Sequence, residues 1–347
     1  MTDLYEYELE KSARDLIEKS LDLKEEETLI ITADTESDER VVNATAAAAF
    51  AAGAKPLVIW NPSPLGVGKD ADPMLPVDAL EAVLKEADAW VEFNNKWLLY
   101  STPFERAMEE NDDLRYMCLV GLDVDMMVRT IGRVDREKLD EFMQKVTQLT
   151  READHMKIKT PAGTDLEFDN NPKYPVDCDA GDASEPGMFF LAGQIAWTPE
   201  LETINGKIVF DGSVDPPVGL LDEPIELTIE EGKVVEIDGG KEAQEFERWL
   251  KSFDDPNMLR LAHISYGFNP GAKLSGNVLE DERIWGCTEW GLGYISGHNY
   301  PPDGIDAPSH TDGICLNSTV WADGVKILEK GSIAHPELEE FKEIFEK

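Results

Sequence analysis

The chain has 347 residues, and 32 lysines and arginines against 71 aspartates and glutamates give it a formal net charge of −39. A chain of this length can bury a sizeable core, and its 42% hydrophobic residues argue against intrinsic disorder. So acidic a chain lacks the basic surface that binding to nucleic acid or docking on an anionic membrane requires, so we expect neither partner.

The acidic residues are spread along the whole chain rather than gathered in a tail. This distribution favours a solvated acidic surface, adapted to a salt-rich (halophilic) cytoplasm, over a dedicated site for cations or basic ligands. We therefore expect lower thermal stability in dilute buffer, where repulsion between carboxylates is least screened. Equal melting temperatures in dilute buffer and in molar KCl would contradict this expectation.

The cysteines and the N-terminus indicate the compartment. The four cysteines are far apart and none forms a CxxC pair, which predicts neither a zinc knuckle nor a disulfide framework. The N-terminus has no basic stretch followed by an apolar one, so we expect no signal peptide. The longest apolar run, Ala46–Ala52, is too short to span a bilayer. These features predict a reduced, cytoplasmic environment.

Strands and helices are expected to alternate over the first half of the chain. The expected strands are Thr28–Thr32, Pro56–Trp60, Ala89–Phe93 and Tyr116–Val120. The expected helices are Asp38–Ala52, Asp78–Ala87 and Phe104–Glu110. This alternation predicts a parallel sheet covered by helices on both faces. No GxGxxG or GxxxxGK[ST] motif follows any of these strands, so we expect no nucleotide site there.

The pattern changes after an amphipathic helix expected over Asp135–Asp154. Short apolar runs then alternate with turn dipeptides such as Asn205-Gly206 and Asp323-Gly324. The expected hairpins join residues 225–229 to 233–237 and 314–321 to 325–328, and the expected helices are Glu242–Phe253 and Pro336–Lys347. The sequence thus predicts an α/β protein with two domains. Residues 1–150 form a parallel α/β domain, and residues 151–347 form a mixed, mostly antiparallel α+β domain.

Only five histidines occur, so their surroundings are informative. His310 and Asp312 lie two residues apart, so on a strand both side chains point to one face and could hold one metal. His263 lies in a second strand-like stretch, residues 259–267. Two imidazoles and one carboxylate would leave about half of an octahedral shell open, as in the facial triad of non-haem Fe(II) oxygenases. The alternative is a chance HxD in which His310 caps a turn.

Other polar residues allow two interpretations each. Glu289 lies in the aromatic and glycine-rich stretch 285–294, where we expect a buried, functional carboxylate. His298 lies in a loop rich in glycine and proline and is either a mobile acid–base group or a solvated residue. Gln194 either binds substrate or bonds only to the backbone. The acidic run 279–283 could be a solvated turn with internal salt bridges.

Five segments together resemble the superfamily that joins the thermophilic metallo-aminopeptidases to the 2,5-dihydroxypyridine 5,6-dioxygenases. The segments are Thr160–Leu166, Gly193–Ile195, Ile204–Gly212, Ala262–Pro270 (AHISYGFNP) and Ser309–Gly313 (SHTDG). The resemblance covers most of the chain and is clearest over residues 151–331. It is far more specific than the HxD motif alone.

The resemblance implies a metal site in the second domain. The aminopeptidases use two metals with bridging carboxylates, whereas the dioxygenases use one Fe(II) held by two histidines and an aspartate. Gln194 and His263 stand where glutamates are expected in the peptidases, and both changes remove charge that a two-metal cluster needs. The resemblance therefore implies His263, His310 and Asp312 as ligands of Fe(II). The dioxygenases of this superfamily are expected to use extra histidines for acid–base chemistry on the substrate, including one from the first domain. This chain has no histidine in residues 1–150.

The leading hypothesis is a mononuclear Fe(II)-dependent dioxygenase that opens a hydroxylated aromatic or N-heteroaromatic ring, with a small molecule and O₂ as its substrates. Tyr266, Glu289 and His298 are its candidate catalytic groups. Gln194 and Ser265 are its candidate substrate-binding residues.

Two alternatives remain open. One is an aminopeptidase-like hydrolase with Zn, Co or Mn, in which Glu289 contributes to a second metal site. The other is a non-catalytic binding or assembly protein with a vestigial site. The resemblance also implies a homo-oligomer, either a dimer or an assembly of dimers.

Overall fold

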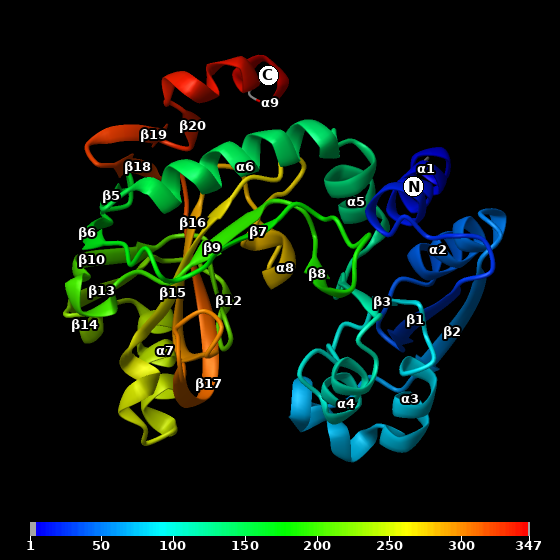
Figure 1. Cartoon of the computed structure of the whole chain (residues 1–347). Helices are drawn as coiled ribbons and strands as arrows, with labels where there is room; N and C mark the ends of the chain where they lie inside the picture. The colour runs from blue at the N-terminus through cyan, green and yellow to red at the C-terminus, as the bar shows by residue number, and fades with distance from the viewer. Residues whose placement is uncertain (1–4, 346–347) are drawn as a thin grey trace. The chain divides into compact units, whose positions relative to one another are not determined.

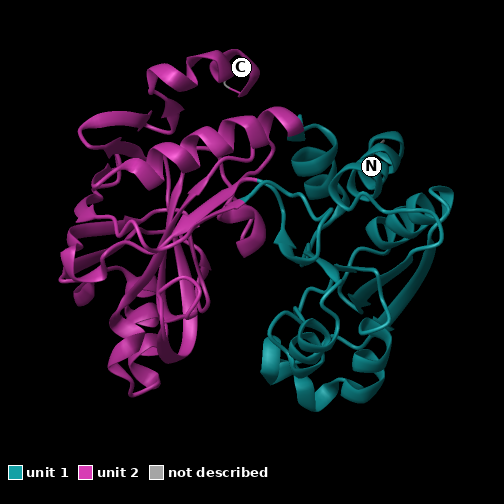
Figure 2. Ribbon diagram, viewed as in Figure 1, with its two compact units in different colours: residues 1–136, 179–192 teal, residues 137–178, 193–347 magenta. Residues whose placement is uncertain are grey.

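The computed structural model describes residues 5–345, which divide into two compact units (Figure 2). Unit 1 comprises residues 1–136 and 179–192, and unit 2 comprises residues 137–178 and 193–347. The domain boundary expected at residue 150 lies inside helix α6 (Arg136–Glu152), which belongs to unit 2 from residue 137 onward. The last two residues of the helix expected over Pro336–Lys347 lie outside the described residues.

Unit 1 is built on a five-stranded sheet with the strand order β2-β1-β3-β4-β8 (Figure 1). Its strands are β1 (Thr28–Asp34), β2 (Lys55–Asn61), β3 (Ala89–Glu92), β4 (Arg115–Cys118) and β8 (Gly187–Phe190). All four neighbouring pairs are parallel. The predicted parallel sheet is confirmed, and β8 is an additional strand contributed by the segment that returns from unit 2.

Helices cover the sheet of unit 1. They are α1 (Glu6–Asp15), α2 (Glu39–Ala51), α3 (Val77–Leu84), α4 (Thr102–Glu110) and α5 (Val124–Met127). Figure 1 shows α1, α2 and α5 together on one side of the sheet and α3 with α4 on the other. Helix α2 begins after Asp38, whose side chain accepts a hydrogen bond from the backbone N–H of Arg40. It ends before Gly53, whose φ of +88° suits a residue without a side chain.

The end of β3 buries a carboxylic acid, Glu92, without exposure to solvent. One carboxyl oxygen accepts from the backbone N–H of Leu98, and the other accepts from the Tyr116 hydroxyl at 2.5 Å. Burial raises the pKa of Glu92 from 4.5 to about 7, although these hydrogen bonds oppose the shift. The folded chain therefore favours the protonated form of this side chain.

Replacing Glu92 by glutamine is expected to stabilise the protein at alkaline pH. The contribution of Glu92 to stability is complete below pH 4.5 and is lost as the pH rises through about 7, because only the unfolded chain ionises it without cost. Glu92→Gln should raise the free energy of unfolding by roughly 3 kcal/mol at about pH 8 and much less at about pH 5. Urea unfolding at both pH values measures this. Glu86→Gln, at an exposed position, is the control, and an equal gain in both variants would contradict the account.

Unit 2 contains an eight-stranded sheet, in the order β14-β13-β10-β6-β5-β18-β19-β20, and a seven-stranded sheet, in the order β12-β11-β17-β16-β15-β9-β7. The strands of the first are β5 (His155–Lys159), β6 (Asp165–Asp169), β10 (Asn205–Phe210), β13 (Ile225–Glu230), β14 (Lys233–Gly239), β18 (Thr319–Ala322), β19 (Val325–Glu329) and β20 (Ser332–Ile333). The strands of the second are β7 (Val176–Asp179), β9 (Gln194–Trp197), β11 (Ser213–Asp215), β12 (Gly219–Leu220), β15 (Leu261–Gly267), β16 (Thr288–Ile295) and β17 (Ile305–Cys315). Pairs such as β15 with β16 and β16 with β17 are antiparallel, which confirms the predicted fold class.

The expected elements of this half are largely found. The hairpin of β13 and β14 and the helices α6 and α7 (Lys241–Ser252) are confirmed. The strand expected over residues 314–321 is wrong in its extent, because its start belongs to β17 and its end is the separate strand β18. Two short helices, α8 (Val278–Asp281) and α9 (Lys342–Phe345), complete the unit. Within residues 5–345 no helix is long and apolar enough to cross a membrane.

The core of unit 2 lies between its two sheets and fixes which face of the seven-stranded sheet is available for a site. Trp290 of β16 meets Phe168 of β6 edge to face, with ring centroids 5.6 Å apart. Both rings are fully buried. Because side chains alternate along a strand, Glu289 and Gly291 belong to the opposite face from Trp290. That opposite face carries the predicted metal ligands.

Candidate metal centre

Three adjacent strands of the seven-stranded sheet bring the predicted ligands together. β15 carries His263, β17 carries His310 and Asp312, and β16 lies between them. One ligand atom from each of these residues lies within 4.8 Å of the others. The HxD spacing on a strand thus does place both side chains on one face. The register of β15 shifts between Leu261 and Ile264, and a bulge of this kind re-aims a side chain such as that of His263.

The two imidazole rings are held in a defined orientation. The rings of His263 and His310 are parallel to within 2°, with centroids 5.1 Å apart. Nδ1 of His310 donates to the backbone carbonyl of Tyr294 at 2.7 Å. This hydrogen bond fixes the tautomer of His310, because a carbonyl can only accept, and it leaves Nε2 free to bind a metal. Nε2 of His310 and Nε2 of His263 lie 2.9 and 3.6 Å from Oδ1 of Asp312.

Glu289 is a fourth group beside these ligands and is fully buried. Its Oε2 accepts from the hydroxyl of Ser265 at 2.5 Å. Its Oε1 lies 3.0 Å from Nε2 of His263 but, among the described residues, no donor meets it at a hydrogen-bonding angle. Burial raises the pKa of Glu289 above its ordinary value, against the nearby imidazole of His263, which lowers it. Apart from this ion-pair contact with His263, Oε1 has no hydrogen-bond partner among the described residues, which suits a cation or a substrate proton as its partner.

The charges around His263 favour a cation. Burial alone disfavours a charged imidazole, but the carboxylates of Glu289 and Asp312 outweigh it and raise the pKa of His263 to about 9. Burial would raise the pKa of Asp312, but His310 and His263 hold it below the ordinary value. Two imidazoles, one ionised carboxylate and an orphaned carboxylate oxygen fit a divalent first-row metal.

A buried polar network lies behind Glu289. Gln194 donates from Nε2 to Ser265 at 3.3 Å and to Glu282 at 3.1 Å. Its Oε1 accepts from Nη2 of Arg283 at 3.0 Å. The Arg283 side chain is 1% exposed, and its Nη1 bonds to Glu282 at 3.0 Å. The two residues predicted to bind substrate, Gln194 and Ser265, therefore lie where they hold Glu289 in place.

The acidic run before β16 differs from its expected character. The interpretation of residues 279–283 as a solvated turn is wrong, because Glu280 and Asp281 are 0% and 1% exposed. The Asp281 carboxylate accepts from the backbone N–H groups of Ser275 and Gly276, which ties a loop down over it. Burial, with Asp312 nearby, raises the pKa of Glu282 to about 8. Sequence reasoning missed Glu282 and Arg283 as parts of the site, although Val278 and Leu279 just before them signal a buried segment.

Two of the candidate catalytic residues lie elsewhere in the unit. Tyr266 is fully buried on the face that supports the core, with its ring 4.7 Å from Trp197. Because Ser265 faces Glu289, its neighbour Tyr266 points to the other face of the sheet, and the acid–base role of Tyr266 stays a prediction. His298 lies in the loop after β16, 69% exposed, with Nε2 3.3 Å from Asp177. It is not among the clustered ligands, and its catalytic role stays a prediction.

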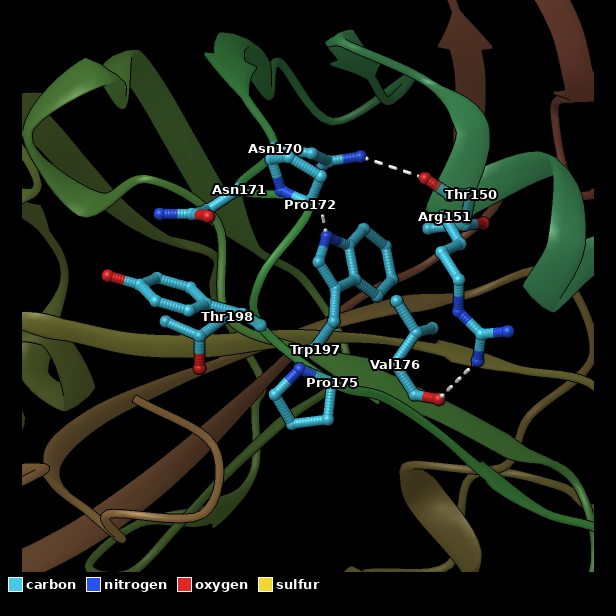
Figure 3. Close-up of a pocket in the computed structure, with 10 residues that line it drawn as sticks. Thr150, Arg151, Asn170, Asn171, Pro172, Pro175, Val176, Trp197 and Thr198 are labelled. Atoms are coloured by element: carbon cyan, nitrogen blue, oxygen red, sulfur yellow. Dashed lines mark hydrogen bonds between the residues drawn. The ribbon is translucent and has the colours of Figure 1, made fainter. Parts of the chain in front are cut away.

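A small pocket of unit 2 shares no residue with this cluster (Figure 3). Its empty volume, which includes space open to solvent, is about 230 Å³. Its lining consists of Thr150, Arg151, Asn170, Asn171, Pro172, Tyr174, Pro175, Val176, Trp197 and Thr198. Figure 3 shows the hydrogen bonds that hold this lining together, from Trp197 to Asn170 at 3.0 Å and from Asn170 to the Thr150 carbonyl at 2.9 Å. The pocket is thus separate from the predicted metal ligands.

The fold and the clustered ligands define a two-unit α/β protein with a candidate site for one metal on a sheet face. The family model described as 2,5-dihydroxypyridine 5,6-dioxygenase matches residues 10–335, so the chain belongs to that family. The 2,5-dihydroxypyridine 5,6-dioxygenase of Pseudomonas putida strain KT2440 is 24% identical over 356 residues, covering 97% of each protein. The predicted dioxygenase branch is therefore confirmed at the level of the family.

Two solved structures share the fold. The structure of 2,5-dihydroxypyridine dioxygenase from Pseudomonas putida KT2440 matches with a TM-score of 0.78 at 20% identity, covering 97% of this chain and 99% of that one. Wild-type AmpT from Thermus thermophilus matches with a TM-score of 0.70 at 17% identity, covering 95% and 99%. Both matches extend over both units, so the fold of each unit is shared.

Proposed function

We propose that the chain is an Fe(II)-dependent dioxygenase that opens the ring of 2,5-dihydroxypyridine or of a closely related hydroxylated N-heteroaromatic compound. The observation that carries the proposal is the convergence of His263, His310 and Asp312 within 4.8 Å on one face of the sheet. The family supplies the dioxygenase class, and its curated member supplies the substrate class.

In this proposal His263, His310 and Asp312 hold the metal. Bound Fe(II) would supply Lewis-acid activation of the substrate hydroxyl and open positions at which substrate and O₂ meet. His310 presents Nε2 because Nδ1 is engaged by the Tyr294 carbonyl. The hydrogen bond to the Tyr294 carbonyl also fixes the orientation of the His310 ring, because it restricts rotation about the side-chain bonds.

Glu289 is the acid–base group of the proposal. Its Oε1 lies beside the ligands and has room for a proton, and its raised pKa brings the carboxyl closer to the range in which a general base works near neutral pH. Ser265 fixes the other oxygen at 2.5 Å, so the carboxylate presents one defined oxygen to the substrate hydroxyl. Gln194 holds Ser265, and through it Glu289, by donating a hydrogen bond to the Ser265 hydroxyl.

The network behind Glu289 supports one metal rather than two. Gln194 is a neutral amide where a two-metal site would gain from a carboxylate. The Arg283 guanidinium lies 3.0 Å from both Gln194 and Glu282. Its positive charge disfavours a second dication at this position. A hydrolase built on two metals is therefore disfavoured.

Anaerobic reconstitution followed by two assays tests the proposal. The metal-free protein is loaded with Fe(II), Zn, Co or Mn, the metals are counted, and O₂ uptake with 2,5-dihydroxypyridine or catechol is measured beside hydrolysis of aminoacyl amides. We expect O₂ uptake with a dihydroxypyridine and only in the Fe(II)-loaded protein. Amide hydrolysis without O₂ uptake would establish a hydrolase instead. A protein that retains none of these metals would establish the vestigial-site alternative.

A further inference from the structure

The strand between the two ligand strands has no side chain at the position beneath the imidazoles. Gly291 of β16 pairs directly with Asp312, and Gly293 pairs with His310. A Cβ atom built on Gly291 would lie 2.4 Å from Cε1 and 2.5 Å from Nδ1 of His263. It would also lie 2.9 Å from Cε1 of His310. Both rings therefore occupy the space that any other residue at 291 would fill.

We propose that Gly291 is a positioning residue, whose missing side chain lets the two imidazoles converge on one metal ion. The inference rests on the proposed function, because it assigns the space over Gly291 to metal ligands. The three heavy atoms nearest to an added Cβ are ring atoms of His263 and His310. An alanine at 291 would consequently displace the ligands rather than the backbone.

The requirement at Gly291 differs from that at its neighbour in the same strand. Gly293 has a φ of +96° and its Cβ would lie 2.4 Å from the backbone carbonyl of Ser309, so there the backbone itself excludes a side chain. Gly291 does not adopt this left-handed conformation. Its backbone can therefore accept alanine. The steric clash of the new Cβ atom is with the imidazoles of His263 and His310, which can rotate away from it.

The variant Gly291→Ala separates ligand positioning from folding. We expect it to bind Fe(II) about 100-fold more weakly or worse, since even partners outside the ligand shell cost 10–100-fold when removed. Anaerobic titration with Fe(II) and metal counting give this affinity. In the metal-free state we expect only a modest fall of its urea midpoint, because the two rings can rotate away from the new Cβ atom.

Gly313→Ala is the matched control in the neighbouring strand. Its added Cβ would meet the Phe210 ring at 2.4 Å, on the side of the sheet away from the ligands. This variant should lose stability while keeping most of its affinity for Fe(II). Equal Fe(II) affinity in Gly291→Ala and the wild type would overturn the inference.

A double variant keeps the test decisive if Gly291→Ala is itself unstable. Removing the ring that the new Cβ meets should restore the metal-free urea midpoint, so Gly291→Ala with His263→Ala should be more stable than additivity predicts. Additive losses in stability would overturn the inference. Wild-type protein that binds no Fe(II) would instead contradict the proposed function, and the same stability cycle in metal-free protein would still decide whether Gly291 makes room for the rings.

Discussion

Replacing His310 by alanine is expected to weaken metal binding by about 100-fold or more and to abolish O₂-dependent turnover. The variant removes one of three ligand atoms that lie within 4.8 Å of one another, and it leaves a half-buried carboxylate, Asp312, without its neighbour at 2.9 Å. Metal content after anaerobic reconstitution and O₂ uptake with 2,5-dihydroxypyridine measure the two effects.

His155→Ala is the matched control for this experiment. His155 is half exposed on β5 and its Nδ1 contacts Asp169 at 2.8 Å, so its loss removes a surface pair of little energetic value. We expect the control to keep wild-type iron content and turnover. Full iron occupancy in the His310→Ala variant would contradict the assignment of the site.

Replacing Arg283 by methionine is expected to destabilise the protein by about 3–5 kcal/mol. The guanidinium is 1% exposed and bonds to Gln194, to Glu282 and to the Leu279 carbonyl at 3.0, 3.0 and 2.8 Å. Methionine fills similar space but leaves Oε1 of Gln194 without its donor and Glu282 without its cationic partner, with only the Gln194 amide still donating to Glu282. Urea unfolding of the metal-free protein at neutral pH measures the loss.

Lys251→Met controls for the removal of a positive charge from the same unit. Lys251 is 62% exposed and pairs with Glu247 at 2.6 Å along helix α7. A surface pair of this kind is worth about 0–1 kcal/mol. If both variants lost the same stability, the buried network would have no special role in holding Glu289.

The sequence predicted the parallel sheet of unit 1 because each of its first four strands is a short apolar run followed by a helical pattern. β8 could not be predicted in the same way. It is a four-residue segment, Gly187–Phe190, far along the chain from its partner β4, and no local periodicity signals a pairing of that kind. The return of residues 179–192 to unit 1 is likewise a tertiary feature that local periodicity does not signal.

The ligand set was predictable in part from local spacing. The HxD pattern on a strand places His310 and Asp312 on one face by alternation alone. His263 was a candidate because it is one of few histidines and lies in a strand-like stretch, and the resemblance then implied it as a ligand. The same alternation shows that Ser265 and Tyr266, as neighbours on β15, cannot both face the site. The role of Arg283 was not predictable, because its burial depends on a contact with Gln194 from a distant strand.

The ligand set His263, His310 and Asp312 contains one carboxylate, so binding of a metal there does not account for the net charge of −39. Most of the acidic residues lie outside the ligand cluster, so the charge bears on the surface and not on the chemistry. The salt-adapted surface, the cytoplasmic location and the homo-oligomer stay predictions.

Anomalous diffraction from crystals of the Fe(II)-loaded protein, measured at the iron edge, tests the central claim most directly. The account predicts one iron peak per chain, bounded by Nε2 of His263, Nε2 of His310 and the Asp312 carboxylate. The absence of a peak between these atoms, or a second peak of equal height beside Glu282 and Glu289, would contradict it.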